Sequence, residues 1–220
     1  MNGLKPFFFI VIGMVVFAAT LPAQASLNKK KGPVPTNAVP ESPLPEIGKI
    51  SDFQFTERSG AAFDSKELKG KVWIASFMFT RCAGICPLMS NHMRMLQEKL
   101  KYKGQVRFVS FSVDPEYDTP EVLRKYAERF NADAKKWFFL TGPKKEIFDL
   151  SERAFRLGVG EIPEKDREAA DQSVGHSARF VLVDQRGIIR GYYDSQSMKD
   201  FDPLISAVER LLLNPPQEKE

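Results

Sequence analysis

Two nearly unbroken apolar segments do most to limit what this chain can fold into. Residues 72–79 read VWIASFMF and residues 106–113 read VRFVSFSV, and both are rich in residues that favour strands. Runs of this kind are typical of parallel strands that are covered on both faces of a sheet. Between them, Pro87 suits a first helical turn, and apolar side chains follow at spacings of three and four. The pattern therefore predicts two parallel strands joined by a crossover helix.

Further elements are expected on both sides of this unit. Ahead of it, the segments 52–56 and 61–63 flank a turn and predict an additional hairpin. Beyond it, the sequence predicts a helix capped by Thr119, a strand at 137–140, a helix at 144–157, a hairpin of 178–183 with 188–193, and a last helix at 199–213. This order predicts an α/β protein with a thioredoxin-like fold, in which helices flank a central mixed sheet and an extra N-terminal hairpin comes first.

The N-terminal residues have the pattern of an export signal. Lys5 precedes an apolar stretch of about 13 residues, shorter than the ~20 that a membrane-spanning helix needs. Residues 23–25 read AQA, a small-residue cleavage pattern. Cleavage of this signal peptide, residues 1–25, would release the protein to the periplasm or to the outer face of the cytoplasmic membrane. Three lysines at 29–31 are unusual just past such a site, so a retained membrane anchor is the alternative.

Composition divides the remaining chain. Residues 26–46 contain five prolines and few large apolar side chains, which predicts an extended linker. Residues 47–213 are long enough to bury one core, and residues 214–220 are expected to be a flexible tail. The formal net charge of +4 falls to about +3 without the signal, since Lys5 is its only charged residue. Basic residues are scattered among acidic ones, so the sequence gives no support for a nucleic-acid partner.

The chain has two cysteines, Cys82 and Cys86, where the first apolar run gives way to the helix. This place lies at the carboxyl edge of the predicted parallel sheet, where α/β folds commonly bind ligands. Soft thiolates select Cu(I) and also carry out disulfide exchange. A structural disulfide would close a short loop and add only ~2 kcal/mol, against ~4.7 for a hundred-residue loop. The three-residue spacer, wider than that of thioredoxin-type motifs, leaves room for an ion, and a helix N-terminus would stabilise the thiolates.

Cu(I) often accepts a third, nitrogen ligand, and the chain offers two histidines. His92 follows Cys86 by six residues, about 120° away around a helix, and is expected to face solvent. His176 lies in a segment just before a predicted strand. It could reach the cysteine edge, or it could be an ordinary loop histidine.

Two other groups of residues are weighed for the same site. Met89 and Met93 fall on the Cys86 side of the helix, where methionines at helical spacing are expected to fill the core rather than to bind metal. Residues 114–118 read DPEYD and are expected to form the turn before the second helix. Carboxylates presented to the site are the alternative.

Four segments together resemble the SCO/SenC family of copper-handling, thioredoxin-fold proteins. Residues 79–87, FTRCAGICP, are similar to its Phe-Thr-x-Cys-x-x-x-Cys-Pro motif, and residues 112–130 contain its Asp-Pro-x-x-Asp-Thr-Pro segment. WFFLTG and the isolated His-Ser before the last hairpin occur in the family's order. The resemblance covers roughly residues 47–212, and the combination is more specific than any single motif.

The resemblance implies that Cys82, Cys86 and His176 bind one copper ion, as Cu(I), with Cu(II) also bound by members. It implies a metallochaperone, rather than an enzyme, that helps to assemble the dinuclear copper centre of cytochrome c oxidase. The implied partner is the copper-accepting subunit of that oxidase, or another copper or thiol protein. The protein would deliver copper or reduce the partner's cysteines. Anchoring in the membrane through the N-terminal segment is common in the family.

One alternative function remains, and the sequence differs from the family's pattern at two places. Cys82 and Cys86 could act as a thiol-disulfide oxidoreductase or redox sensor without stable metal binding, with Cys82 attacking and Cys86 resolving. Gly175 stands where the family usually has an aspartate before the distal histidine, which removes a carboxylate that could orient the imidazole. Ala83 and Gly84 stand where many members carry Pro-Asp.

Overall fold

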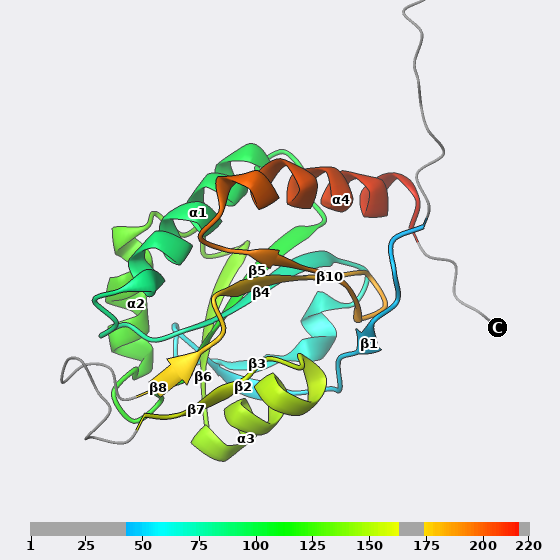
Figure 1. Cartoon of the computed structure of the whole chain (residues 1–220). Helices are drawn as coiled ribbons and strands as arrows, with labels where there is room; N and C mark the ends of the chain where they lie inside the picture. The colour runs from blue at the N-terminus through cyan, green and yellow to red at the C-terminus, as the bar shows by residue number, and fades with distance from the viewer. Residues whose placement is uncertain (1–42, 163–173, 216–220) are drawn as a thin grey trace, which may run out of the picture. The chain divides into compact units, whose positions relative to one another are not determined.

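An eight-stranded mixed sheet organises the part of the chain that the computed structural model describes, residues 43–162 and 174–215 (Figure 1). The strand order is β1-β10-β9-β4-β5-β6-β2-β3. The expected signal peptide, most of the expected linker and most of the expected tail lie outside the described residues. Among the described helices, none combines the length and the apolar character needed to cross a membrane.

The predicted parallel unit forms the centre of this sheet. The two apolar runs are β4 (Val72–Met78) and β5 (Val106–Ser112), which pair in parallel along their whole length. Every residue of β4 is buried, as its unbroken apolar sequence requires. The crossover is α1 (Ile85–Lys99), and β6 (Trp137–Thr141) extends the parallel sheet on the far side of β5. The prediction for this region is confirmed.

Antiparallel strands complete both edges of the sheet. On one side, β9 (Arg179–Val183) pairs with β4 and is followed by β10 (Ile188–Asp194) and the two-residue strand β1 (Gly48–Lys49). On the other side, β2 (Gln54–Glu57) pairs with β6 and forms a hairpin with β3 (Ala62–Asp64). Both hairpins were predicted, whereas β1 was too short to be recognised.

The helices cover both faces of the sheet. In Figure 1, α1 and α4 (Phe201–Leu213) lie on one face, and α3 (Lys144–Asp149) lies on the other. The helix α2 (Pro120–Arg129) packs near β6, and its N-cap is Thr119, as predicted. Short 3₁₀ turns precede β4 and α4, at Ser65–Leu68 and Met198–Asp200.

The third predicted helix is shorter than its sequence pattern. The pattern predicted a helix over 144–157, but α3 ends at Asp149 and passes into a π-helical turn, Leu150–Ala154. Arg156 then takes a positive φ of 54°, which no regular helix continues through. Leu150, Phe155 and Leu157 lie within the predicted range and are buried, although they are outside α3.

A separate two-stranded sheet was not predicted. It pairs β7 (Val159–Glu161) with β8 (Val174–His176) in antiparallel register, and Val159 lies opposite His176. The residues around His176 were expected to form a loop before a strand. His176 is instead the last residue of a strand in its own small sheet.

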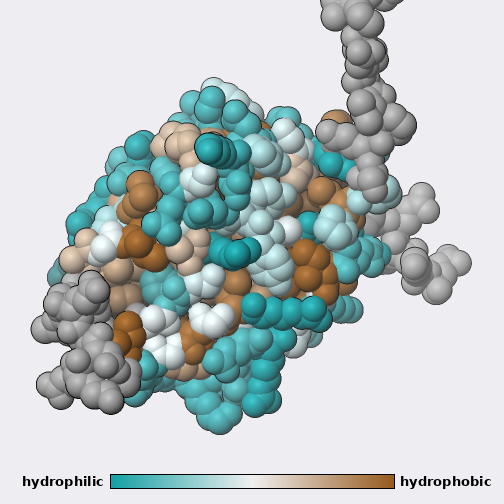
Figure 2. All heavy atoms as spheres, viewed as in Figure 1, coloured by the Kyte–Doolittle hydropathy of each residue, from teal (hydrophilic) through white to brown (hydrophobic). Residues whose placement is uncertain are grey.

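The surface offers few large apolar side chains to solvent. On the face drawn in Figure 2, apolar residues form small patches separated by hydrophilic ones. The exposed large hydrophobic residues of the described chain are Leu88, Tyr102, Tyr117, Met198 and Leu213. Scattered side chains of this kind are ordinary on a folded protein.

Candidate metal centre

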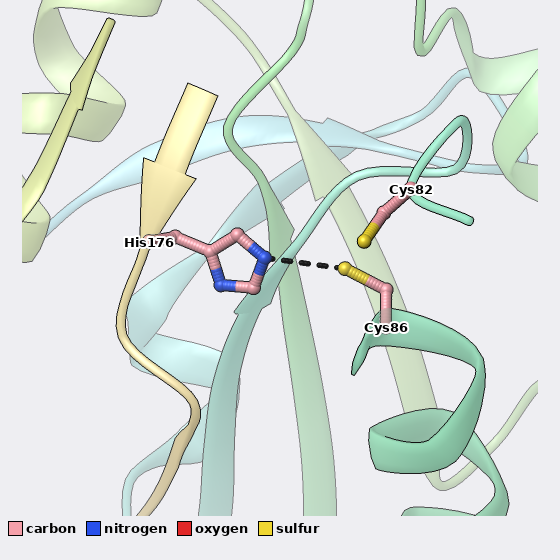
Figure 3. Close-up of side chains that lie close together, drawn as sticks. All are labelled: Cys82, Cys86 and His176. Carbon is pink, nitrogen blue, oxygen red and sulfur yellow. Dashed lines mark hydrogen bonds between the residues drawn. The ribbon is translucent and has the colours of Figure 1, made fainter. Parts of the chain in front are cut away.

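Two sulfurs and one imidazole converge at the carboxyl edge of the parallel strands (Figure 3). Cys82 lies in the loop after β4, Cys86 is the second residue of α1, and His176 ends β8. One ligand atom from each residue lies within 4.8 Å of the others, and Cys86 Sγ is 3.2 Å from His176 Nε2. Three segments that are up to 94 residues apart in sequence therefore present soft and borderline donors to one point.

The two cysteines differ in exposure and in proton affinity. Both are free thiols, but Cys86 is fully buried while Cys82 is only partly buried. The hydrogen bond from the Cys86 thiol is the largest influence on Cys82 and lowers its pKa to about 4, although burial opposes the shift. The same pairing, together with burial, raises the pKa of Cys86. Cys82 therefore carries the thiolate charge and Cys86 holds the proton.

The first turn of α1 adds to the stabilisation of the Cys82 thiolate. Its N-cap is Gly84, which has no side chain to satisfy the free N–H groups of the turn. Backbone hydrogen bonds from Cys86 and Gly84 to Cys82 lower the pKa of Cys82 further. The predicted effect of the helix N-terminus is present, and it acts on the cysteine that lies outside the helix.

His176 is oriented by neighbours on both sides of its ring. Nδ1 lies 3.3 Å from the Ser177 carbonyl oxygen, so a proton on Nδ1 would donate to that oxygen and leave the Nε2 lone pair facing Cys86 Sγ. The ring of Phe79 meets the imidazole edge to face, at 5.7 Å between centroids and 87° between planes. These contacts hold the imidazole with Nε2 facing the sulfur of Cys86.

The other histidine was predicted wrongly in one respect. His92 was expected to face solvent, but it is 8 % exposed, and its Nδ1 lies 2.6 Å from the Ser195 carbonyl oxygen. Its ring also packs edge to face on Phe201, the first residue of α4. His92 is buried because the segment leading into α4 covers it on α1. His92 stands outside the cluster of ligand atoms.

The methionines are core residues, as expected. Met89 and Met93 are 2 % and 1 % exposed. Their burial on α1 fits the apolar spacing that predicted the helix.

The Asp-Pro segment forms the predicted turn and also presents carboxylates to the loop that carries Cys82. In the turn, the Tyr117 N–H donates to the Asp114 carbonyl oxygen at 3.1 Å. The Asp114 carboxylate accepts hydrogen bonds from Arg81 Nε at 2.9 Å and Nη2 at 2.6 Å, and the Arg81 guanidinium stacks on the Tyr117 ring at 4.5 Å. The predicted turn is confirmed, and the carboxylates bond to the loop that carries Cys82 rather than joining the cluster of ligand atoms.

Asp118 makes a second, buried set of contacts with the same loop. Its carboxylate accepts from the Thr80 N–H at 3.1 Å, from the Thr80 hydroxyl, and from the Ser112 hydroxyl at 2.5 Å. Burial raises the pKa of Asp118, against the effect of these hydrogen bonds. Thr80 and Ser112 were not among the predicted site residues. The signal that could have found them is that both follow or end neighbouring parallel strands, as the two apolar runs already implied.

Comparison with known proteins identifies the family. The family model described as SCO1/SenC matches residues 43–213. The chain belongs to the SCO1/SenC family. The predicted resemblance is thereby confirmed over the whole described domain.

Relatives of this SCO1/SenC protein extend from bacteria to plants. It is 38 % identical over 162 residues to the SCO1 protein homolog of Bacillus subtilis, covering 73 % of this chain and 81 % of that protein. The structure of BsSco, which has a disulfide switch and belongs to the Sco family of cytochrome c oxidase assembly proteins, has a TM-score of 0.67 at 34 % identity, covering 79 % and 98 % of the two chains. Copper-bound ScoI of Arabidopsis thaliana has a TM-score of 0.62 at 28 % identity, covering 74 % and 97 %.

Family membership and site chemistry agree. The Sco neighbours support the thioredoxin-like fold class, and copper-bound relatives exist in the family. Two thiols and one imidazole are donors that suit Cu(I). Cys82, Cys86 and His176 could therefore hold a metal ion at this edge of the sheet.

Proposed function

We propose that this protein binds one copper ion, preferentially Cu(I), through Cys82, Cys86 and His176 and passes it to another protein. The observation that carries the proposal is the convergence of the three ligand atoms within 4.8 Å of one another. Two thiolates and one imidazole give Cu(I) a three-coordinate site, and the same donors accept Cu(II). The protein acts as a metallochaperone, and copper is its cargo.

The asymmetry of the two cysteines supports loading and release. Cys82 is already a thiolate, whereas the raised pKa of Cys86 means that copper must displace a proton there. Ala83 and Gly84, which follow Cys82, are exposed, while Cys86 is fully buried. An incoming ligand from a partner therefore meets Cys82 first and can displace the copper ion stepwise.

The proposed recipient is the copper-accepting subunit of cytochrome c oxidase, or another copper or thiol protein. Family membership supports this choice, because BsSco belongs to the Sco family of assembly proteins for that oxidase. The signal pattern of residues 1–25 supports export to the periplasm or the outer face of the cytoplasmic membrane, either as a cleaved protein or anchored there. A proline-rich linker would then carry the domain of residues 47–213.

Thiol-disulfide exchange is the second candidate function. It is favoured by the pKa of about 4 at partly exposed Cys82 beside a buried, protonated Cys86. The Cys82 thiolate would attack a partner's disulfide and release one partner thiol. Cys86, after losing its proton, would then attack Cys82 Sγ and release the second thiol. The partner gains two electrons, and the Cys82–Cys86 pair becomes a disulfide.

A competitive Cu(I) titration of the reduced protein tests the proposal. We expect tight one-to-one binding, and we expect His176→Ala to lower the affinity by about 100-fold or more because a ligand is lost. His92→Gln is the matched control, since it removes the other histidine from outside the cluster and should leave the affinity unchanged. Weak binding that is equal in wild type and His176→Ala would refute the copper role. Rapid reduction of a disulfide substrate by His176→Ala would favour the exchange role.

A further inference from the structure

Asp118 is an unusual buried carboxylate. Three carboxylates are buried among the described residues, and two of them are ion paired, Asp114 with Arg81 and Asp184 with Arg190. Asp118 is 0 % exposed, and no ion pair with a described cationic side chain is found for it. Burial of a carboxylate without a cation carries a large desolvation penalty. The hydrogen bonds that Asp118 accepts from Thr80 and Ser112 must offset this penalty.

The hydrogen bonds of Asp118 tie two elements together. One oxygen accepts from Ser112, the last residue of β5, and the same carboxylate accepts from the backbone and the hydroxyl of Thr80. Thr80 lies beyond the end of β4, and its N–H group donates to the Asp118 carboxylate. Asp118 therefore fastens the segment to the end of β5.

The fastened segment leads directly into the metal centre. We call residues 79–82 the strap. The Cys82 N–H donates to the Phe79 carbonyl oxygen at 3.4 Å, so the strap folds back as a turn whose last residue is a proposed copper ligand. Its first residue, Phe79, contacts the imidazole of His176. A shift of the strap would therefore move one ligand and release the packing of another.

We propose that Asp118 is a positioning residue that locks the strap to the sheet and so sets the affinity of the copper site. This inference rests on the proposed copper-binding function. Cys86 is held by α1 and by its own burial, so the strap is the part of the thiolate pair that needs a separate anchor. Preorganised ligands lose less conformational freedom when they bind the ion.

The second tie on the strap is weaker. Arg81 and Asp114 are ion paired, but the Arg81 side chain is 36 % exposed. Asp114 is buried, but Arg81 reaches it through a long, partly exposed side chain that loses freedom on pairing, so this pair constrains the backbone of the strap less than the direct bond to the Thr80 N–H does. Asp118 is thus the principal anchor of the strap.

The test compares three variants of the purified, reduced protein. Asp118→Ala removes every acceptor, whereas Asp118→Asn keeps an oxygen for the Thr80 N–H and can still bond the hydroxyls after they rotate. Asp184→Asn is the matched control, because Asp184 is equally buried and lies among Arg186 and Arg190 instead of at the strap. Each variant is measured by competitive Cu(I) titration and by hydrogen exchange of residues 79–82.

We expect Asp118→Ala to weaken Cu(I) binding by about 10- to 100-fold, the usual effect of losing an outer partner of a metal ligand. The rate of amide hydrogen exchange within the strap should rise by about tenfold, while the amides of β4 stay protected. Asp118→Asn should restore both values to within about threefold of wild type, and Asp184→Asn should change neither. If Asp118→Ala does not fold, Thr80→Val, which removes one donor of the strap, should shift both values in the same direction by a smaller factor.

Two outcomes overturn the inference and leave the proposed function intact. One is a Cu(I) affinity of folded Asp118→Ala, or of Thr80→Val in its place, that equals wild type. The other is exchange that rises equally throughout the sheet, which indicates a structural role alone. If wild type itself binds no Cu(I), the proposed function fails, and strap exchange alone then decides whether Asp118 is an anchor.

Discussion

The two sides of the metal centre are built very differently. The cysteine side follows β4, whose seven residues are all buried in the eight-stranded sheet, and it is fastened by Asp118. The histidine side ends β8, a three-residue strand that pairs with β7 in a separate small sheet. An isolated pair of short strands is marginally stable at best.

This difference suggests that the two sides affect copper binding in different ways. On the histidine side, His176 packs against Phe79 and Cys86, Lys144 pairs with Glu161 on β7, and Val159 on β7 is buried in the core. All seven residues of β4 are buried, whereas Gly160, Gly175 and His176 of the small sheet are only partly buried, so displacing the cysteine side disturbs more of the core. We expect the cysteines to determine whether copper binds and the histidine to determine how tightly it is held.

The largest effect should come from the cysteine side. Cys86→Ser replaces a buried soft ligand with a hydroxyl that Cu(I) does not favour, so the affinity should fall by well over the roughly 100-fold cost of losing an outer partner. Cys82→Ser should have a similar effect. The measurement is competitive Cu(I) titration beside His176→Ala, which should lose less than either cysteine variant. A greater loss for His176→Ala would reverse the proposed division.

Much of the cysteine side could be predicted from the sequence, because local patterns determine it. The unbroken apolar run of β4 and the helical spacing of α1 place Cys82 and Cys86 at one sheet edge without further information. The strand pattern could have placed Thr80 and Ser112 at neighbouring strand ends, but it could not show that Asp118 bonds to them, since that depends on which turn residue faces the neighbouring strand. That detail is set by packing.

The structure around His176 could not be predicted from the sequence in the same way. The small sheet of β7 and β8 has three residues in each strand, too few for a periodic pattern to show. His176 was therefore supported as a ligand by the family resemblance rather than by its local sequence. The burial of His92 was missed for a related reason, because the cover comes from the segment before α4, more than 100 residues away.

The second prediction concerns the difference in thiol pKa between Cys82 and Cys86. With a pKa of about 4, Cys82 is a thiolate throughout the range from pH 6 to 8. Its alkylation rate in the reduced, metal-free protein should be nearly constant there, whereas an ordinary thiol with a pKa near 8.5 reacts about tenfold faster for each pH unit. Buried, protonated Cys86 should stay unmodified. Peptide mass spectrometry after iodoacetamide pulses separates the two cysteines, and the unfolded protein serves as control. If the alkylation rate of Cys82 rose tenfold per pH unit, the lowered pKa of Cys82 would be contradicted.

The smallest expected effect comes from restoring the aspartate that the family usually has before the distal histidine. Gly175 has room for a side chain, because a Cβ atom there would lie 3.6 Å from Ile162 Cγ1, an ordinary contact. It would also lie 3.9 Å from the Gly160 carbonyl oxygen on β7. Successive side chains of a strand point to opposite faces, so a carboxylate at this position would point away from the imidazole of His176.

Gly175→Asp should therefore change the Cu(I) affinity by less than about threefold, since the carboxylate lies on the other face of β8 and acts only through water. Gly175→Asn is the matched control, because it has the same shape without the charge. A change of more than tenfold in the aspartate variant alone would show that the carboxylate reaches the imidazole or the bound ion. The histidine side would then depend on charge as well as on packing. An equal, small change in both variants would instead mean that glycine at this position is a tolerated departure, because the geometry of the cysteine side does most to determine copper affinity.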